Sequence, residues 1–253
     1  MKVHFIRRFL VGFLLATGLS LTIALAAEAN TVTFVTPAGS TANGQAVDAQ
    51  AILSTGTDSL SIALSNLLTA SQMHDAGQLV SDLSFTLMGM ATTSAGSVIS
   101  STGTFINVGA GGSVASGTSG GTAPNLVAWA LSNSGSTYKL DGLAGKGAGS
   151  LTPANLIIGG TAGDSTPYSM ANGSIAGNPA HNPFVQGTAD FVLNIPGVTA
   201  TTNISSVVFS FSTSSGVNVP GVPKSSGVPE PATFGLFGLG LAGLGLARRK
   251  RKS

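Results

Sequence analysis

Apolar and polar residues alternate with a period of two over several short stretches of the chain. Leu60, Ile62 and Leu64 alternate with small, mostly polar residues, as in a strand that buries one face. The same alternation recurs at 47–53, 83–87, 127–131, 137–143, 189–195 and 207–211. In the last of these stretches the pattern places Phe209 inside and Ser210 outside, so we expect a charge to be costly at 209 and tolerated at 210.

Turn signals separate these stretches. Residues 55–58 (Thr-Gly-Thr-Asp) come directly before one strand, 132–135 join two others, and Pro196-Gly197 ends the strand at 189–195. One short stretch, 71–80, is a helical candidate, although Gly77 weakens it. The sequence therefore predicts an all-β fold.

The expected architecture is an antiparallel β-sandwich or jelly-roll-like single domain over residues 30–212. Residues 109–122 are expected to form a loop, and residues 213–227 a flexible linker, because both are rich in small polar residues. No repeat of 20–50 residues is visible in the sequence.

The N-terminus has the pattern of a secretory signal peptide. Lys2, Arg7 and Arg8 precede an apolar run over 9–26, and Ala27-Glu28-Ala29 supplies small residues at a cleavage site. We therefore predict a signal peptide over 1–29 that is cleaved before Asn30. The apolar run is longer than usual, so an uncleaved signal anchor is the alternative.

The C-terminus, 228–253, combines three features in a fixed order. These are the motif Val228, Pro229, Glu230 and Pro231, the sixteen uncharged residues 232–247, and the basic cluster Arg248, Arg249, Lys250, Arg251 and Lys252. Sixteen helical residues span about 24 Å, which is short of a hydrocarbon core of about 30 Å, so 232–247 is predicted to be a weak transmembrane helix. The basic cluster is expected to remain cytoplasmic, with everything before Val228 on the outer side.

This tail resembles the PEP-CTERM sorting signal of Gram-negative bacteria. The resemblance implies recognition by an exosortase, a membrane transpeptidase-like enzyme that would be the processing partner at the inner membrane. It also implies removal of the tail and release to the cell surface or the extracellular matrix. Similar tails are also named ice-binding protein C-terminal domain, a name that does not imply ice binding. Residues 182–191, 196–198 and 207–211 more loosely resemble the final strands of exported β domains that carry this tail.

A GPI signal and a plain tail anchor both fit this C-terminus less well. A GPI signal would end in an apolar segment and not in a basic one. A plain tail anchor would account for the apolar span and the charges but would leave Pro-Glu-Pro unexplained.

Most of the positive charge lies outside the expected mature region. Of the eleven Lys and Arg residues, 30–227 keeps only Lys139, Lys146 and Lys224, against seven Asp, so its net charge is about −4. A nucleic-acid partner is therefore not expected. The absence of cysteine excludes disulfides, zinc fingers and cysteine nucleophiles.

Candidate catalytic and metal-binding residues lack the context that their chemistry needs. A G-x-S-x-G match centres on Ser119, with Asp164 and His181 after it, but the Gly/Ser-rich surroundings do not predict a strand, an elbow and a helix. His74 stands beside Asp75 without an H-x-x-H pattern or a carboxylate cluster. We therefore predict no catalytic residue, no cofactor and no metal site.

A glycan-binding module would need exposed aromatic side chains. Trp129 shares a face with Val127 and Leu131 and is expected in the core, whereas Tyr168 lies in a loop-like stretch and is the better stacking candidate; Tyr138 is a further aromatic. The leading interpretation is an exported, non-enzymatic surface or matrix protein associated with exopolysaccharide or biofilm. The alternative is a glycan-binding module, and the third is a serine hydrolase acting through Ser119.

Overall fold

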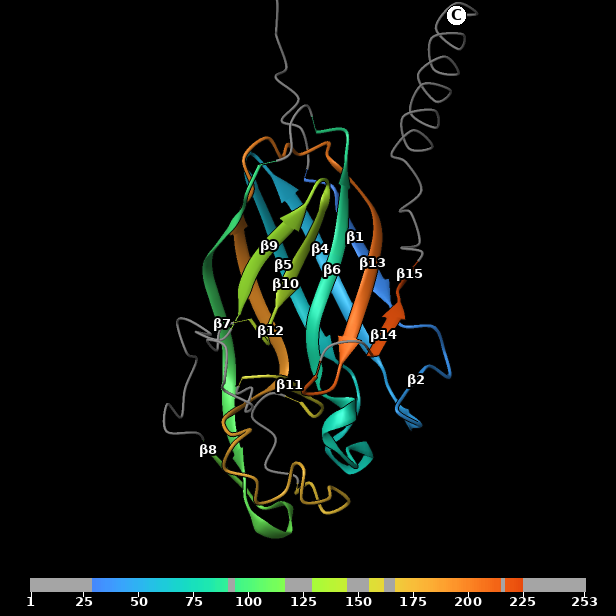
Figure 1. The fold of residues 1–253 in the computed structure, drawn as a ribbon, viewed down its shortest axis with the longest axis vertical. Coiled ribbons are helices and arrows are strands. Elements are labelled where there is room, and N and C mark those ends of the chain that lie inside the picture. Colours follow the sequence, from blue (N-terminus) through green and yellow to red (C-terminus); the bar gives the residue numbers. More distant parts are fainter. Residues whose placement is uncertain are drawn as a thin grey trace, which may run out of the picture.

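The computed structural model describes residues 29–90, 94–116, 129–144, 155–161, 167–214 and 217–224. These residues form strands and three short 3-10 turns, so the prediction of an all-β protein is confirmed (Figure 1). The longer strands are β1 (Thr31–Val35), β4 (Ala49–Gly56), β5 (Ser59–Asn66), β6 (Val80–Met88), β7 (Ser97–Val108), β9 (Ala130–Ser134), β10 (Thr137–Asp141), β12 (Phe184–Asn194) and β13 (Asn203–Phe211). The shorter ones are β2 (Thr41–Ala42), β3 (Gln45–Ala46), β8 (Val114–Ser116), β11 (Ile157–Ile158), β14 (Val217–Pro220) and β15 (Val222–Pro223).

Thirteen strands belong to one hydrogen-bonded sheet, and β2 and β3 pair separately. A first wing of the sheet has the order β9-β10-β6-β13-β14, and a second wing has the order β8-β7-β12-β5-β4-β1-β15. The short strand β11 pairs with β6 on one side and with β12 on the other, and so joins the wings. Because β11 runs parallel to β12, the sheet is mixed; a sandwich or jelly roll made of separate antiparallel sheets stays a prediction.

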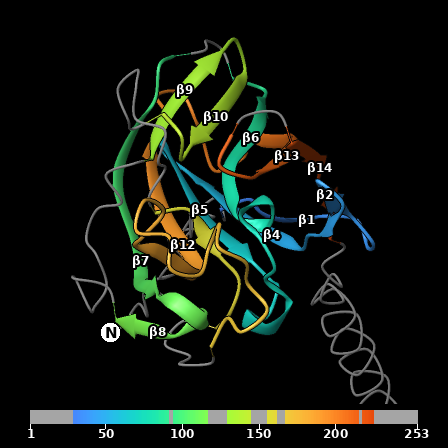
Figure 2. The ribbon, with the colours of Figure 1, turned by 60° about the horizontal axis from the view of Figure 1, so that its bottom comes forward.

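The two wings share one hydrophobic core. Leu83 and Phe85 of β6 in the first wing belong to the same buried cluster as Ile62 of β5 and Phe191 of β12 in the second wing. Figure 2 shows the strands of the two wings on either side of this core. Trp129 is buried as expected, with its ring centroid 5.0 Å from that of Phe191. Alternation along the strands thus places one face of each wing in the core.

The helix expected over 71–80 is not formed. The chain instead makes two 3-10 turns, η1 (Ala70–Gln72) and η2 (Ala76–Gln78). Asp75 caps the second turn by accepting a hydrogen bond from the backbone N–H of Gly77 at 2.8 Å. The side-chain oxygen of Gln78 accepts the N–H groups of His74 and Asp75, so side chains satisfy the backbone where a helix would have used carbonyls.

The linker expected over 213–227 also differs from the structure, because β14 and β15 lie within it. Val217–Pro220 pairs with β13 in the first wing, and Val222–Pro223 pairs with β1 in the second. Gly221 carries the chain from one wing to the other. A Cβ atom at this glycine would lie 2.9 Å from the Phe209 ring, so the close approach requires glycine.

The first and last described residues lie toward one end of the domain, which we call the exit end. The backbone N–H of Asn30 donates to the carbonyl of Ala200 at 3.1 Å, and that of Lys224 donates to Thr33 in β1 at 2.8 Å. Because β15 is antiparallel to β1, the chain runs toward Asn30 as it leaves β15. At the opposite end, which we call the far end, Met73, Tyr168 and Phe184 belong to a second buried cluster.

Candidate functional site

The site with the most distinctive geometry is a pocket at a fork in the sheet. On one edge β12 pairs first with β11, at Val185 and Gln186, and then with β5, from Thr188 onward. Gly187 lies between these two pairings, with φ 72°. The register with β7 on the other edge also shifts between Gln186 and Ala189. This bulge separates β5 from β11 and leaves space between them.

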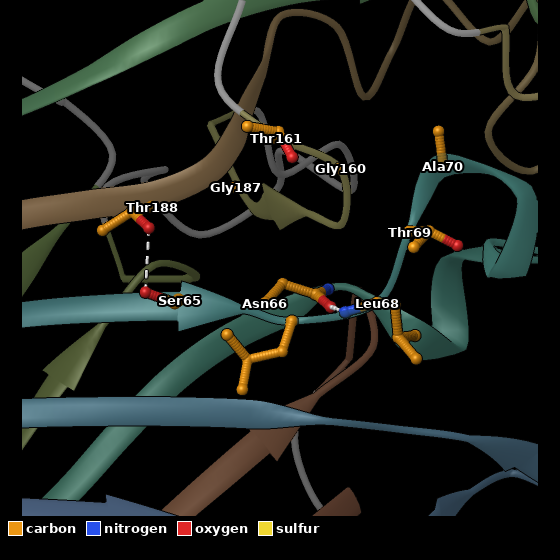
Figure 3. Close-up of a pocket in the computed structure, with 10 residues that line it drawn as sticks. Ser65, Asn66, Leu68, Thr69, Ala70, Gly160, Thr161, Gly187 and Thr188 are labelled. Carbon is orange, nitrogen blue, oxygen red and sulfur yellow. Dashed lines mark hydrogen bonds between the residues drawn. The ribbon is translucent and has the colours of Figure 1, made fainter. Parts of the chain in front are cut away.

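This fork pocket encloses about 400 Å³ (Figure 3). Its lining residues are Ser65, Asn66, Leu67, Leu68, Thr69, Ala70, Gly160, Thr161, Gly187 and Thr188. The volume lies near the lower end of the range for small-molecule sites, about 300–1,000 Å³. Among the described residues that line the pocket none is charged, and they offer hydroxyls, the amide of Asn66, backbone groups and two leucines.

Hydroxyl groups from two strands meet at one wall of the pocket. Ser65 Oγ of β5 and Thr188 Oγ1 of β12 lie 2.8 Å apart, and the bond is drawn as a dashed line in Figure 3. A hydroxyl has one donor and two acceptor positions, so this pair retains capacity for a further partner. Thr161 is exposed above the pair. The wall is therefore suited to a ligand that carries hydroxyls of its own.

A buried amide fixes the lower edge of the fork. Asn66, which is 3% exposed, donates from Nδ2 to the carbonyl of Gln78 at 2.8 Å and to that of Ile157 at 3.2 Å. Its Oδ1 accepts the N–H of Leu68 at 3.3 Å. One side chain thereby connects the end of β5, the turn before β6 and the start of β11. These hydrogen bonds hold the edge of the pocket at the end of β5.

The candidate for sugar stacking, Tyr168, lies beneath the pocket and is fully buried, so the expectation that it is exposed is wrong. Its hydroxyl donates to the carbonyl of Gly159 at 2.7 Å. Gly160 covers the ring at φ 109°, and a Cβ at this position would lie 3.0 Å from the tyrosine oxygen. Tyr138 is also buried, stacked on Phe85 at 5.7 Å. A loop position does not ensure exposure, because residues 167–183 fold over the second cluster.

A separate polar cluster lies on the first wing, away from the pocket. Lys139 Nζ lies 3.2 Å from Asp82 Oδ2 and 2.8 Å from Asp141 Oδ2. The two aspartates are directly opposite each other on β6 and β10. Asp82 is 1% exposed, and its Oδ1 finds no hydrogen-bond partner in the part of the chain that the structure describes.

The two carboxyls of this cluster differ in proton affinity. Burial is the main reason that the pKa of Asp82 rises to about 7; the hydrogen bond and charge of Asp141 add to it, and Lys139 opposes it. Burial also acts to raise the pKa of Asp141, but hydrogen bonds with Asp82 and Lys139 hold it below its usual value. Asp82 is therefore the carboxyl that holds a proton longest. One lysine between two acids is typical of a structural ion cluster, and none of these three residues lines the fork pocket.

Two of the residues singled out for hydrolase or metal chemistry, Asp75 and His181, make local contacts with the backbone in the described part of the chain. Ser119 and Asp164 lie outside the described residues. His181 Nδ1 lies 2.8 Å from the carbonyl of Ser174, within a turn. Asp75 is the N-cap of η2 and accepts the backbone N–H of Gly77. Among the residues whose structure is described, no group of three His, Cys, Asp or Glu could hold a metal ion.

The C-terminal tail is assigned by comparison with protein families. The PEP-CTERM protein-sorting motif matches residues 227–252. The tail is a PEP-CTERM sorting motif. It implies export that depends on an exosortase, with sorting through the membrane to the cell surface. No curated protein and no solved structure matches the chain.

Most residues expected to act in export and sorting fall outside the described part of the chain. These are Ala27, the PEP-CTERM residues Val228, Pro229, Glu230 and Pro231, the span 232–247, and the basic residues Arg248, Arg249, Lys250, Arg251 and Lys252. Ala29 is described, and it directly precedes the folded strands. No helix in the described ranges has the length and apolar character needed to cross a bilayer.

The PEP-CTERM motif follows the folded domain closely. Lys224 is still hydrogen-bonded to β1, and three residues separate it from Val228. Four residue steps span at most about 14 Å. The sequence pattern alone indicated neither this proximity nor the fork pocket. The signals that could have indicated the pocket are Gly187 inside a strand pattern and Gly159-Gly160 directly after an apolar pair.

Proposed function

We propose that this chain is a non-enzymatic exported protein that an exosortase-type system delivers to the cell surface or the extracellular matrix. The observation that carries the proposal is the PEP-CTERM motif at 227–252, which follows a folded β domain after a few residues. The proposed path is insertion in the inner membrane, removal of the tail and release of the domain.

The arrangement of the domain supports this path. Asn30, the first residue after the proposed signal-peptide cleavage, is already hydrogen-bonded at the exit end, and the chain runs toward this same end as it leaves β15. A domain with both membrane-directed segments on one side can fold while each is still in the bilayer. The far end, with the fork pocket, then faces away from the membrane.

A non-enzymatic role is proposed because the described residues offer no assembled catalytic group. The histidine of the hydrolase candidate, His181, is engaged with the backbone of its own turn. The Asp82–Lys139–Asp141 cluster does not line the fork pocket. Turnover of esters, peptides or glycosides that is lost on Ser119→Ala would overturn this part of the proposal.

The sorting step is tested by changing the charged residue of the motif. Each proline fixes φ near −65° and keeps the preceding residue extended, so Val228 to Pro231 offers an enzyme a stiff segment with a single charge, on Glu230. We expect Glu230→Ala to insert normally but to remain full length in the inner membrane. Intact-mass analysis of shed protein shows whether the tail has been removed. If shed wild-type protein still ends in Arg-Lys-Arg-Lys-Ser, the tail is not removed and serves only as an anchor.

A second candidate function is association with exopolysaccharide through direct glycan binding. The observation that favours it is the uncharged, hydroxyl-lined fork pocket at the far end of the domain. Retention of the released protein by purified polysaccharide from the producing cells tests it.

A further inference from the structure

We propose that the fork pocket binds a terminal or side-chain sugar of a neutral polysaccharide. The inference deepens the proposed matrix role, and it rests on that role for its biological setting. The strands themselves build the pocket: the bulge at Gly187 moves β12 from one partner strand to the next and leaves the space unfilled. The side chain of Asn66 holds the two sides of this gap together through its hydrogen bonds to the carbonyls of Gln78 and Ile157.

The lining groups favour a neutral, hydroxylated ligand. Ser65 and Thr188 offer paired hydroxyls on one wall, and Thr161 lies exposed above them. Leu67 is an exposed apolar residue, 45% accessible, among those that line the pocket, and in the proposal it meets the C–H face of a sugar ring. Hydrogen bonds made through hydroxyls and an apolar contact on one side match the alternation of O–H and C–H groups on a pyranose.

Charge argues against an anionic polymer. The described residues that line the pocket include no lysine or arginine, and the expected mature region carries a net charge of about −4. The next residue on the same face of β12 is Asp190, which is exposed and would repel a polyanion. Alginate-like or nucleic-acid chains would therefore meet a negative surface without a compensating lysine or arginine in the pocket.

The position of the pocket also fits a polymer. Ser65 lies at the C-terminal end of β5, whereas Asn30 and the turn at Asp58 lie at the other end of the same wing. The pocket therefore remains open to the outside while the chain is held in the membrane by its tail. A matrix polysaccharide would reach it both before and after release.

The test uses the protein shed by the cells. Affinity electrophoresis measures how strongly its migration is retarded in gels that contain dextran, galactomannan or alginate. We expect retardation by at least one neutral polymer and none by alginate. The double variant Ser65→Ala/Thr188→Val removes both hydroxyls of the pair, so neither is left without its partner. Loss of hydrogen bonds from this wall should weaken retardation about tenfold in apparent affinity.

The first wing offers a matched control. Ser206 Oγ donates to Thr86 Oγ1 at 3.0 Å, which is also a Ser–Thr pair across neighbouring strands but lies outside the pocket. We expect Ser206→Ala/Thr86→Val to bind as the wild type does. Equal binding by the pocket variant, retardation by alginate alone, or no retardation by any polymer would each overturn the inference. Sorting is read separately, from the mass of the shed protein, so failure of one proposal does not imply failure of the other.

Discussion

At the scale of single residues, buried polar side chains determine features that the alternating pattern does not reveal. Asn66 and Gln78 are almost fully buried, and their amides satisfy backbone groups of three segments that are far apart in the sequence. Asp82 is equally buried, and its Oδ1 has no hydrogen-bond partner among the described residues. A buried polar atom without a partner lowers stability, so Asp82 is where a single substitution should be most informative.

Asp82→Asn should make stability less dependent on pH. The pKa of Asp82 is about 7 in the folded protein against an ordinary value of 3.8, so the folded state retains a proton that the unfolded state loses. Its contribution to stability is present below about pH 4, falls as the pH rises to about 7, and is then flat. We expect the variant to match the wild type near pH 4 and to be more stable at pH 8 by up to about 4 kcal/mol.

Urea unfolding of both proteins at pH 4, 6 and 8 measures this difference. The lowered pKa of Asp141 changes the free energy of unfolding only below about pH 4, where it makes stability fall as the pH falls. It therefore does not mask the effect of Asp82 between pH 4 and pH 8. A variant that is less stable than the wild type at pH 8 would show that ionised Asp82 stabilises the fold through Lys139.

At the scale of elements, a register shift in the pairing of β6 with β13 changes which side chains on one face of β13 are buried. The register shifts at Ser81, which is an extra residue on β6 between the partners of Ser210 and Phe211. Ser210 therefore lies opposite Asp82, is 4% exposed, and donates to Asn218 of β14 at 2.7 Å. The outer side of this strand is buried at one end and exposed at the other.

Substitutions along β13 should follow this burial and not the simple alternation. Phe209→Ala should destabilise the protein by about 3–5 kcal/mol because it empties part of the shared core. Ser210→Asp should also destabilise it by about 2 kcal/mol or more, since it buries a second carboxylate opposite Asp82. The sequence pattern alone predicts a small effect at 210, and the structure overturns that expectation.

Ser206→Asp is the matched control, because Ser206 points to the same side of β13 but is exposed. Its effect on the free energy of unfolding should stay below about 1 kcal/mol. Thermal or urea unfolding measures all three variants, and equal effects at 206 and 210 would contradict the burial that the structure assigns.

At the scale of the whole molecule, β14 and β15 connect the fold to the sorting tail. They add one strand to the edge of each wing and end at Lys224, close to the motif. In the proposed path, the folded domain would therefore approach the membrane surface when the tail is processed. Residues 225–227 would then limit the distance between the folded domain and an enzyme embedded in the membrane.

Deleting residues 225–227 should reduce tail removal, whereas inserting six Gly/Ser residues after Lys224 should not. The deletion shortens the maximum span by about 10 Å and brings the domain against the membrane. The fraction of full-length protein in the inner membrane, measured by immunoblotting, reports the effect. Normal processing of the deletion variant would show that β15 detaches from β1 before cleavage.

The sequence by itself determined the strands and the destination of the protein. Period-two alternation is a local property, so the cores of β5, β6, β12 and β13 could be placed without the fold. The PEP-CTERM motif is likewise local, because an enzyme reads it as a linear segment, and the family comparison confirms it.

Only the tertiary structure decided which polar residues are buried and where a cavity forms. The apolar residues of β7 do not alternate with polar ones, and β14 and β15 lie in a stretch that reads as a linker. Both β7 and β15 are held by strands that are distant in the sequence, β12 and β1. The fork pocket depends on one bulge that changes the partner of β12, and the burial of Tyr168 depends on a loop that folds over a second core. These features arise from contacts between segments far apart in the chain, and a pattern read along a single segment does not contain them.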